Sequence, residues 1–184
     1  MLFDPTRYGP DVARILALDG NGRRLMPLEC SKCSSQEART LLKTFQPRDL
    51  FPNQPEPEAP LAGLYLYFSC FEESHQLAQD CQTAEGKLWH AILHRQEPDS
   101  ANAAYWFQKV GPHPTYSPVA QAAVEVLNRM PAAEFRAAQW DPSAFIRFCE
   151  RAREQPGSVD MQAALEIQCA EWQILFDYSA RLFP

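Results

Sequence analysis

The sequence predicts a single all-α domain, a helical bundle, and three observations lead to this fold class. First, 16 prolines punctuate the 184 residues, and the proline-free segments between them have the lengths of helices. Second, apolar residues in these segments recur at steps of three and four, the period of an amphipathic helix. Third, 46% of the residues are hydrophobic, which supplies enough apolar surface for one core at this length. We therefore treat residues 1–184 as one domain.

The N-terminal third, residues 1–46, is expected to hold two short helices joined by loops, over 12–18 and 36–45. An Asp-Gly-Asn-Gly turn at residues 19–22 leaves a short β-hairpin as the alternative, because this composition suits a tight turn between strands. Residues 47–60 contain five prolines and little that can form a core. We expect them to be a Pro-rich surface connector.

The rest of the chain, residues 61–184, is expected to be the helical body. The clearest periodicity is in the last segment, where Met161, Leu165 and Cys169 begin a run of apolar residues on one face. Capping residues precede several segments, and proline or glycine follows them. The expected helices span 58–80, 87–97, 101–110, 119–130, 143–155 and 158–183.

Charge and composition exclude several classes of function. The formal net charge is −6, whereas nucleic acids and anionic membranes are bound by basic surfaces, so we expect neither as a partner. The N-terminus lacks the basic and apolar regions of a secretory signal, and the apolar run 61–71 is too short to span a bilayer. These features predict a cytoplasmic protein. A Gly-rich phosphate loop and a Gly-x-Ser-x-Gly nucleophile elbow are both absent from the sequence.

Six cysteines in a cytoplasmic chain are expected to be mostly reduced. Cys30 and Cys33 have the spacing of a redox or zinc half-site, but there is no second Cys-x-x-Cys and no strand–helix context for a thioredoxin motif. Their role stays open. The other four read as small core residues: Cys70, Cys81, Cys149 and Cys169.

Histidines make the segment 72–113 the candidate site. His90 and His94 are four residues apart on an expected helix, where two imidazoles can reach one metal ion. Glu72 and His75 form a Glu-x-x-His pair of the kind that supplies ligands in helical bundles. These four residues predict a site for a divalent transition metal. Against it, the complete di-metal pattern and the zinc-protease motif are both missing, and helical histidines often only donate to a carbonyl or carboxylate.

A second set of polar residues surrounds the expected helix break at Pro98. In the functional interpretation, Arg95 clamps a carboxylate or phosphate and Glu97 or Asp99 acts as a general base. In the structural interpretation, Asp99 caps the helix from residue 101 and pairs with Arg95. The candidate ligand-binding residues are Arg95, Glu97, Asp99, Asn102 and Tyr105.

Two resemblances cover this part of the chain. The helix pair expected over 87–97 and 101–110 is similar to one tetratricopeptide-type hairpin, since small residues precede an aromatic pair and a glycine ends the unit. The cluster Trp-His-x-x-Leu-His-Arg-x-Glu-x-Asp…Asn-Ala-x-Tyr-Trp-Phe resembles a family of uncharacterised hypothetical proteins. That resemblance implies a shared central cluster and brings no activity with it.

Two functions follow as hypotheses. The first is a ligand- or metal-binding helical protein, with an enzyme as one form of it. The second is a non-catalytic protein-protein interaction module, which needs an exposed apolar groove beside Tyr105 and Trp106. Convergence of His75, His90 and His94 in space would favour the first.

Overall fold

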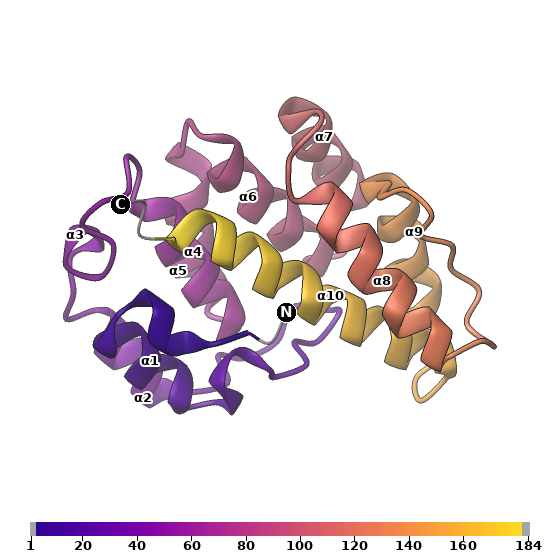
Figure 1. Ribbon diagram of the computed structural model, residues 1–184, viewed down its shortest axis with the longest axis horizontal. Helices are drawn as coiled ribbons and strands as arrows, with labels where there is room; N and C mark the ends of the chain where they lie inside the picture. The colour runs from indigo at the N-terminus through magenta and orange to yellow at the C-terminus, as the bar shows by residue number, and fades with distance from the viewer. Residues whose placement is uncertain (1–2, 182–184) are drawn as a thin grey trace.

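Helix α10 (Val159–Ala180) is the longest helix of the described chain, and the other helices are arranged along it (Figure 1). The computed structural model describes residues 3–181. In Figure 1, α1 (Pro10–Ala17) lies at one end of the molecule, whereas α8 (Tyr116–Arg129) and α9 (Pro142–Arg153) lie at the other. Because α10 packs against α4, α8 and α9, it joins the two ends.

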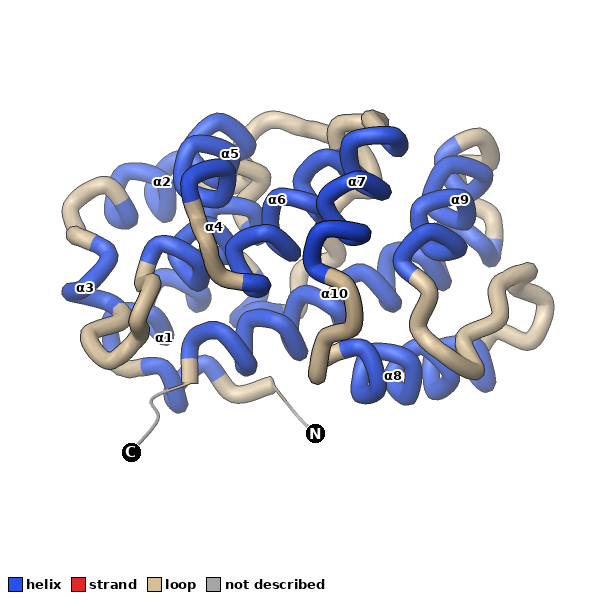
Figure 2. The backbone as a smooth tube through the Cα atoms, turned by 90° about the horizontal axis from the view of Figure 1, so that it is seen from above, coloured by secondary structure: helices blue, strands red, loops and turns tan. Residues whose placement is uncertain are grey.

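The all-α prediction is confirmed for the described residues, among which Figure 2 shows helices and loops and no strand. None of the helices in this part of the chain combines the length and the apolar character needed to cross a membrane. The remaining elements are η1 (Pro5–Tyr8), η2 (Gly20–Gly22), α2 (Gln36–Leu42), α3 (Pro47–Leu50), α4 (Glu58–Tyr67), α5 (Phe71–Asp80), α6 (Ala84–Gln96) and α7 (Ser100–Val110).

Local capping signals place several helix starts as expected. The side chain of Ser158 accepts a hydrogen bond from the amide of Met161 at 3.1 Å, and α10 begins at the next residue. Asp141 caps α9 in the same way, with Pro142 in the first turn. The last predicted helix ends at Ala180 in the structure, and the part of that prediction at 182–183 lies outside the described residues.

The core consists of two apolar clusters that share α10. One cluster surrounds α4 and α6 and includes Trp89 and Trp172, and the other lies between α8, α9 and the first half of α10 around Phe148. Gln168 and Glu171 lie between the two clusters along α10 and are almost completely buried. Buried polar side chains such as these need hydrogen-bond or ion-pair partners.

The predicted long helix over 58–80 is wrong, because α4 ends at Tyr67 and α5 begins at Phe71. Ser69 adopts a positive φ of 56°, and the amide of Cys70 donates back to the carbonyl of Tyr65 at 2.9 Å. The chain then reverses, so that α5 packs against α4 and the Ser74 hydroxyl donates to the carbonyl of Ala62 at 2.9 Å. Apolar spacing suggested one helix because α4 is buried on every side and therefore has no polar face to mark its end.

The N-terminal third follows the helix-and-loop prediction. Helix α1 is followed by a turn in which Asn21 has a φ of 53°, and no β-hairpin forms in the described residues. The segment 47–60, which was predicted to be a surface connector, is partly helical and partly buried. It contains α3 and the first turn of α4, and Phe51 and Pro60 are buried. Prolines here begin helices at their first turn, where a missing N–H costs nothing.

Candidate metal centre

Three neighbouring helices carry the site. Figure 2 shows α5, α6 and α7 in succession, and α6 packs against both of the others. Helix α6 begins at a cap in which the Thr83 hydroxyl accepts from the amide of Gly86 at 3.3 Å. From this start, His90 and His94 lie one turn apart on the side of α6 that faces His75 of α5. The sequence spacing and the α4–α5 reversal thus bring the histidines together.

His75, His90 and His94 converge on one place. One ring nitrogen from each lies within 4.8 Å of those of the other two. The Nε2 atoms of His90 and His94 are 2.9 Å apart, and the ring centroids of His75 lie 4.8 Å from His90 and 5.5 Å from His94. Nitrogen atoms this close either share a proton or share an ion.

Burial keeps the imidazoles of His90 and His94 neutral. His90 is 4% exposed and His94 is 6% exposed, while His75 is half-buried. Burial, followed by the charges of His94 and His75, lowers the pKa of His90 to about 4. Burial also lowers the pKa of His94, although the nearby Glu97 carboxylate opposes this shift. At neutral pH His90 and His94 therefore offer lone pairs, which is the form that binds a metal.

Polar and aromatic side chains complete the surroundings. The Nδ1 atom of His94 lies 3.0 Å from Oε2 of Glu97, and Nδ2 of Asn102 lies 3.1 Å from Nε2 of His94. The indole of Trp106 packs on the ring of His90 with centroids 4.4 Å apart. The Nδ1 atom of His90 is buried and has no hydrogen-bond partner. One nitrogen of His90 thus faces the cluster, and the other faces apolar surroundings.

Sequence spacing did not identify all of these neighbours. Glu97 follows His94 by three residues, and this spacing in the sequence predicts that the two side chains share a helix face. Asn102 and Trp106 are four residues apart on α7, which places both on the side facing α6. The sequence alone gives no sign that Trp106 covers an imidazole, because this follows from the packing of α7 on α6.

Glu72 does not join the histidines. Its side chain is exposed and its carboxylate accepts from Gln76 at 2.8 Å, one turn further along α5. The Glu-x-x-His spacing was correct, but α5 turns His75 toward α6 and leaves Glu72 facing outward. The predicted ligand set therefore contracts to the three histidines.

Arg95 is a buried structural residue and does not face the histidine cluster. Its side chain is 1% exposed and forms an ion pair with Glu171 of α10, in which Nη1 donates to Oε1 at 3.2 Å. Gln168 accepts a further bond from Arg95, and the guanidinium stacks on Phe145 at 4.6 Å. The expected pairing of Arg95 with Asp99 is therefore wrong, and so is a clamp open to a ligand. A partner 76 residues away gives no local sequence signal.

Asp99 is the cap of α7, as the structural interpretation proposed. Its Oδ1 accepts from the amide of Asn102 at 3.1 Å. Tyr105 is 49% exposed, with the ammonium of Lys109 above its ring at 5.2 Å, so it is a surface residue. Of the five candidate ligand-binding residues, the structure thus brings Glu97 and Asn102 to the site.

The fourth histidine lies elsewhere. His113 is buried between the helices, where Nδ1 is 2.8 Å from the hydroxyl of Thr115 and Nε2 is 3.5 Å from Glu85. Its ring packs against Tyr178 of α10. These contacts satisfy both nitrogens, so His113 is a structural histidine and a natural control for the others.

The cysteines were expected to be mostly reduced, but two of them form a disulfide. Cys33 forms a disulfide with Cys70, which joins the segment before α2 to the reversal between α4 and α5. Cys30 is free and exposed, so Cys30 and Cys33 do not act together as a half-site. The prediction of reduced core cysteines holds for Cys81, Cys149 and Cys169, and burial raises the pKa of Cys169 to about 11.

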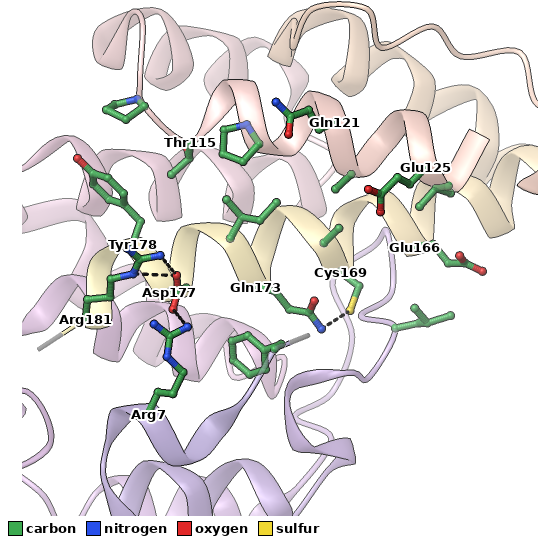
Figure 3. Close-up of a pocket in the computed structure, with 18 of the residues that line it drawn as sticks. Arg7, Thr115, Gln121, Glu125, Glu166, Cys169, Gln173, Asp177, Tyr178 and Arg181 are labelled. Carbon is green, nitrogen blue, oxygen red and sulfur yellow. Dashed lines mark hydrogen bonds and ion pairs between the residues drawn. The ribbon is translucent and has the colours of Figure 1, made fainter. Parts of the chain in front are cut away.

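A separate cleft of about 630 Å³ lies between α8, α10 and the N-terminal segment (Figure 3). Figure 3 shows Arg7, Asp177 and Arg181 at one end, and Glu125 and Glu166 toward the other. The predicted interaction groove beside Tyr105 is not this cleft, because neither Tyr105 nor Trp106 lines it. The histidine cluster also lies outside it.

Comparison with known proteins assigns no family. No protein-family model matches the chain, and neither a curated protein nor a solved structure shows significant similarity to it. The chemistry of the site therefore has to be argued from its own residues.

Proposed function

We propose that this protein binds a divalent transition metal ion through His75, His90 and His94. The observation that carries the proposal is the convergence of three imidazole nitrogens within 4.8 Å, supplied by two adjacent helices. Imidazole nitrogen suits zinc, copper and nickel, whereas the oxygen ligands preferred by magnesium and calcium are few here. The ion would crosslink α5 to α6.

The spacing of the ligand atoms supports this assignment. Two nitrogens bound to one zinc ion at about 2.0–2.1 Å in tetrahedral geometry are separated by about 3.3 Å. The Nε2 atoms of His90 and His94 are 2.9 Å apart, so these two rings would open slightly on binding. The nitrogens of the three histidines lie within 4.8 Å of one another, so His75 would move toward the other two. Three protein ligands leave one coordination position for water or a small ligand, as in catalytic zinc sites.

The test is the metal content of protein purified without chelator and reconstituted with Zn²⁺, measured by elemental analysis. We expect about one ion per chain in the wild type and a large loss in His90→Ala. His113→Ala is the matched control, since it removes a buried histidine outside the cluster, and it should retain the ion. Circular dichroism checks that each variant is folded.

Two outcomes would contradict the proposal. One is equal metal content in the wild type and His90→Ala, and the other is no metal in the reconstituted wild type. Titration with Co²⁺ gives an independent reading, because its visible absorption reports imidazole coordination directly. His94→Ala should abolish that spectrum while His113→Ala keeps it.

A further inference from the structure

Glu97 has a fixed position beside the histidine cluster. It follows α6 directly, and its amide donates to the carbonyls of Leu93 at 3.0 Å and His94 at 3.2 Å. These bonds hold its backbone at the end of the last helical turn. Its carboxylate reaches back by one turn, so that Oε2 lies 3.0 Å from Nδ1 of His94. The Glu97 side chain is 36% exposed, whereas the imidazole that it contacts is almost completely buried.

This contact determines which nitrogen of His94 carries the proton. A carboxylate accepts hydrogen bonds and donates none, so the Nδ1 atom of a neutral His94 must hold the proton. The Nε2 atom is then left with its lone pair. This is the atom that faces Nε2 of His90 at 2.9 Å and Asn102 at 3.1 Å. Glu97 thereby aims the free lone pair of His94 at the place where the three imidazoles meet.

Charge gives Glu97 a second role. Three neutral imidazoles bring no negative charge to a divalent ion, and a buried uncompensated charge is costly. Glu97 carries the carboxylate that contacts a proposed ligand directly. Asp99 also acts on His94 through its field, but its carboxylate is engaged by the first turn of α7. A carboxylate behind a metal-bound histidine both orients the ring and raises its basicity.

We infer that Glu97 is the positioning residue of the metal site, which fixes the Nδ1–H form of His94 and supplies a compensating negative charge in contact with that ligand. This inference rests on the proposed function, because it concerns the same site. It predicts that removing the carboxylate weakens metal binding without removing any ligand atom. It also predicts a change in His94 that is visible before any metal is added.

The first experiment measures the dissociation constants of Zn²⁺ and Co²⁺ for Glu97→Gln and Glu97→Ala. Glutamine keeps an oxygen that accepts from Nδ1 but loses the charge, whereas alanine loses both. We expect affinity to fall by about 10-fold for glutamine and by up to about 100-fold for alanine. Glu72→Gln is the matched control on α5, since it removes a carboxylate that faces away from the histidines, and it should bind as the wild type does.

The second experiment records the ¹⁵N chemical shifts of the histidine rings in metal-free protein. We expect His94 to hold its proton on Nδ1 in the wild type and in Glu97→Gln, and to lose this preference in Glu97→Ala. A purely structural role for Glu97 at the helix end would lower the melting temperature and leave both the shifts and the affinity unchanged. That result overturns the inference.

The possible failures can be told apart. If the wild type binds no metal, the proposed function falls, and the positioning role falls with it. If the wild type binds metal and both Glu97 variants bind it equally well, the function stands and the inference is overturned. Weaker binding in Glu97→Ala, a changed His94 tautomer and normal binding in Glu72→Gln together support the inference.

Discussion

His90 couples the protonation of the site to the stability of the protein. Its pKa is about 4 in the folded state, against 6.5 for an unperturbed histidine, because burial and two neighbouring imidazoles disfavour the charged form. The unfolded chain therefore binds a proton at a higher pH than the folded chain does. By linkage, stability is complete above about pH 6.5 and is lost as the pH falls toward 4.

We predict that the free energy of unfolding of metal-free protein falls by up to about 3 kcal/mol over this pH range on account of His90. Urea denaturation at a series of pH values in the presence of a chelator measures the fall. The variant His90→Gln should show a shallower dependence, because its side chain does not titrate. An equally steep dependence in the variant would show that His90 is not its source.

Variants of Asp99 distinguish a helix cap from a role that depends on the charge of its carboxylate. Because its Oδ1 accepts from the amide of Asn102, Asp99→Asn keeps an oxygen that can do the same. We predict nearly wild-type stability for Asp99→Asn and a loss of about 1 kcal/mol for Asp99→Ala, measured by thermal or chemical denaturation. If asparagine were as damaging as alanine, a charge-dependent role would replace the cap.

Residues with local partners could be predicted from the sequence, and residues with distant partners could not. The cap at Asp99 and the facing pair His90 and His94 follow from helix geometry alone. The partner of Arg95 is Glu171, on a helix that begins more than 60 residues later. Local sequence patterns therefore could not predict this ion pair. The prediction of Glu72 as a ligand was wrong for a related reason. Sequence spacing shows which residues share a helix face, but the packing of the helix decides what that face contacts.

At the scale of elements, helices bounded by caps, proline or glycine were predictable, and the reversal between α4 and α5 was not. No glycine or proline marks residues 68–70, and the turn is held by contacts from elsewhere. The amide of Ser34 donates to the carbonyl of Phe68 at 2.7 Å, and Cys33 is bonded to Cys70. This non-local turn is what brings His75 toward α6. The metal site therefore depends on a feature that local patterns did not reveal.

At the scale of the whole molecule, the ion pair of Arg95 with Glu171 joins α6 to α10 at the boundary of the two apolar clusters. The side chains of both residues are almost completely excluded from solvent, with 1% and 6% exposed. Such a pair adds little net stability compared with an apolar replacement, but losing one partner leaves a buried charge uncompensated.

We predict that Arg95→Met and Glu171→Leu each lower the free energy of unfolding by about 3–5 kcal/mol. The double variant should recover much of that loss, because no unpaired charge remains. Guanidinium denaturation of the four proteins of this double-mutant cycle gives the coupling energy. Additive losses in the double variant would mean that the two residues act independently.

The burial of α4 on all sides also has a consequence for how the chain is made. The carbonyl of Gly63 accepts from the indole nitrogen of Trp172 at 2.8 Å, across 109 residues of sequence. During synthesis, the most apolar helix is therefore released long before the helix that shields it. Until α10 leaves the ribosome, α4 is exposed hydrophobic sequence of the kind that chaperones recognise and that aggregates when left uncovered. Emergence of α10 from the ribosome is thus the step at which the nascent chain can first close its core.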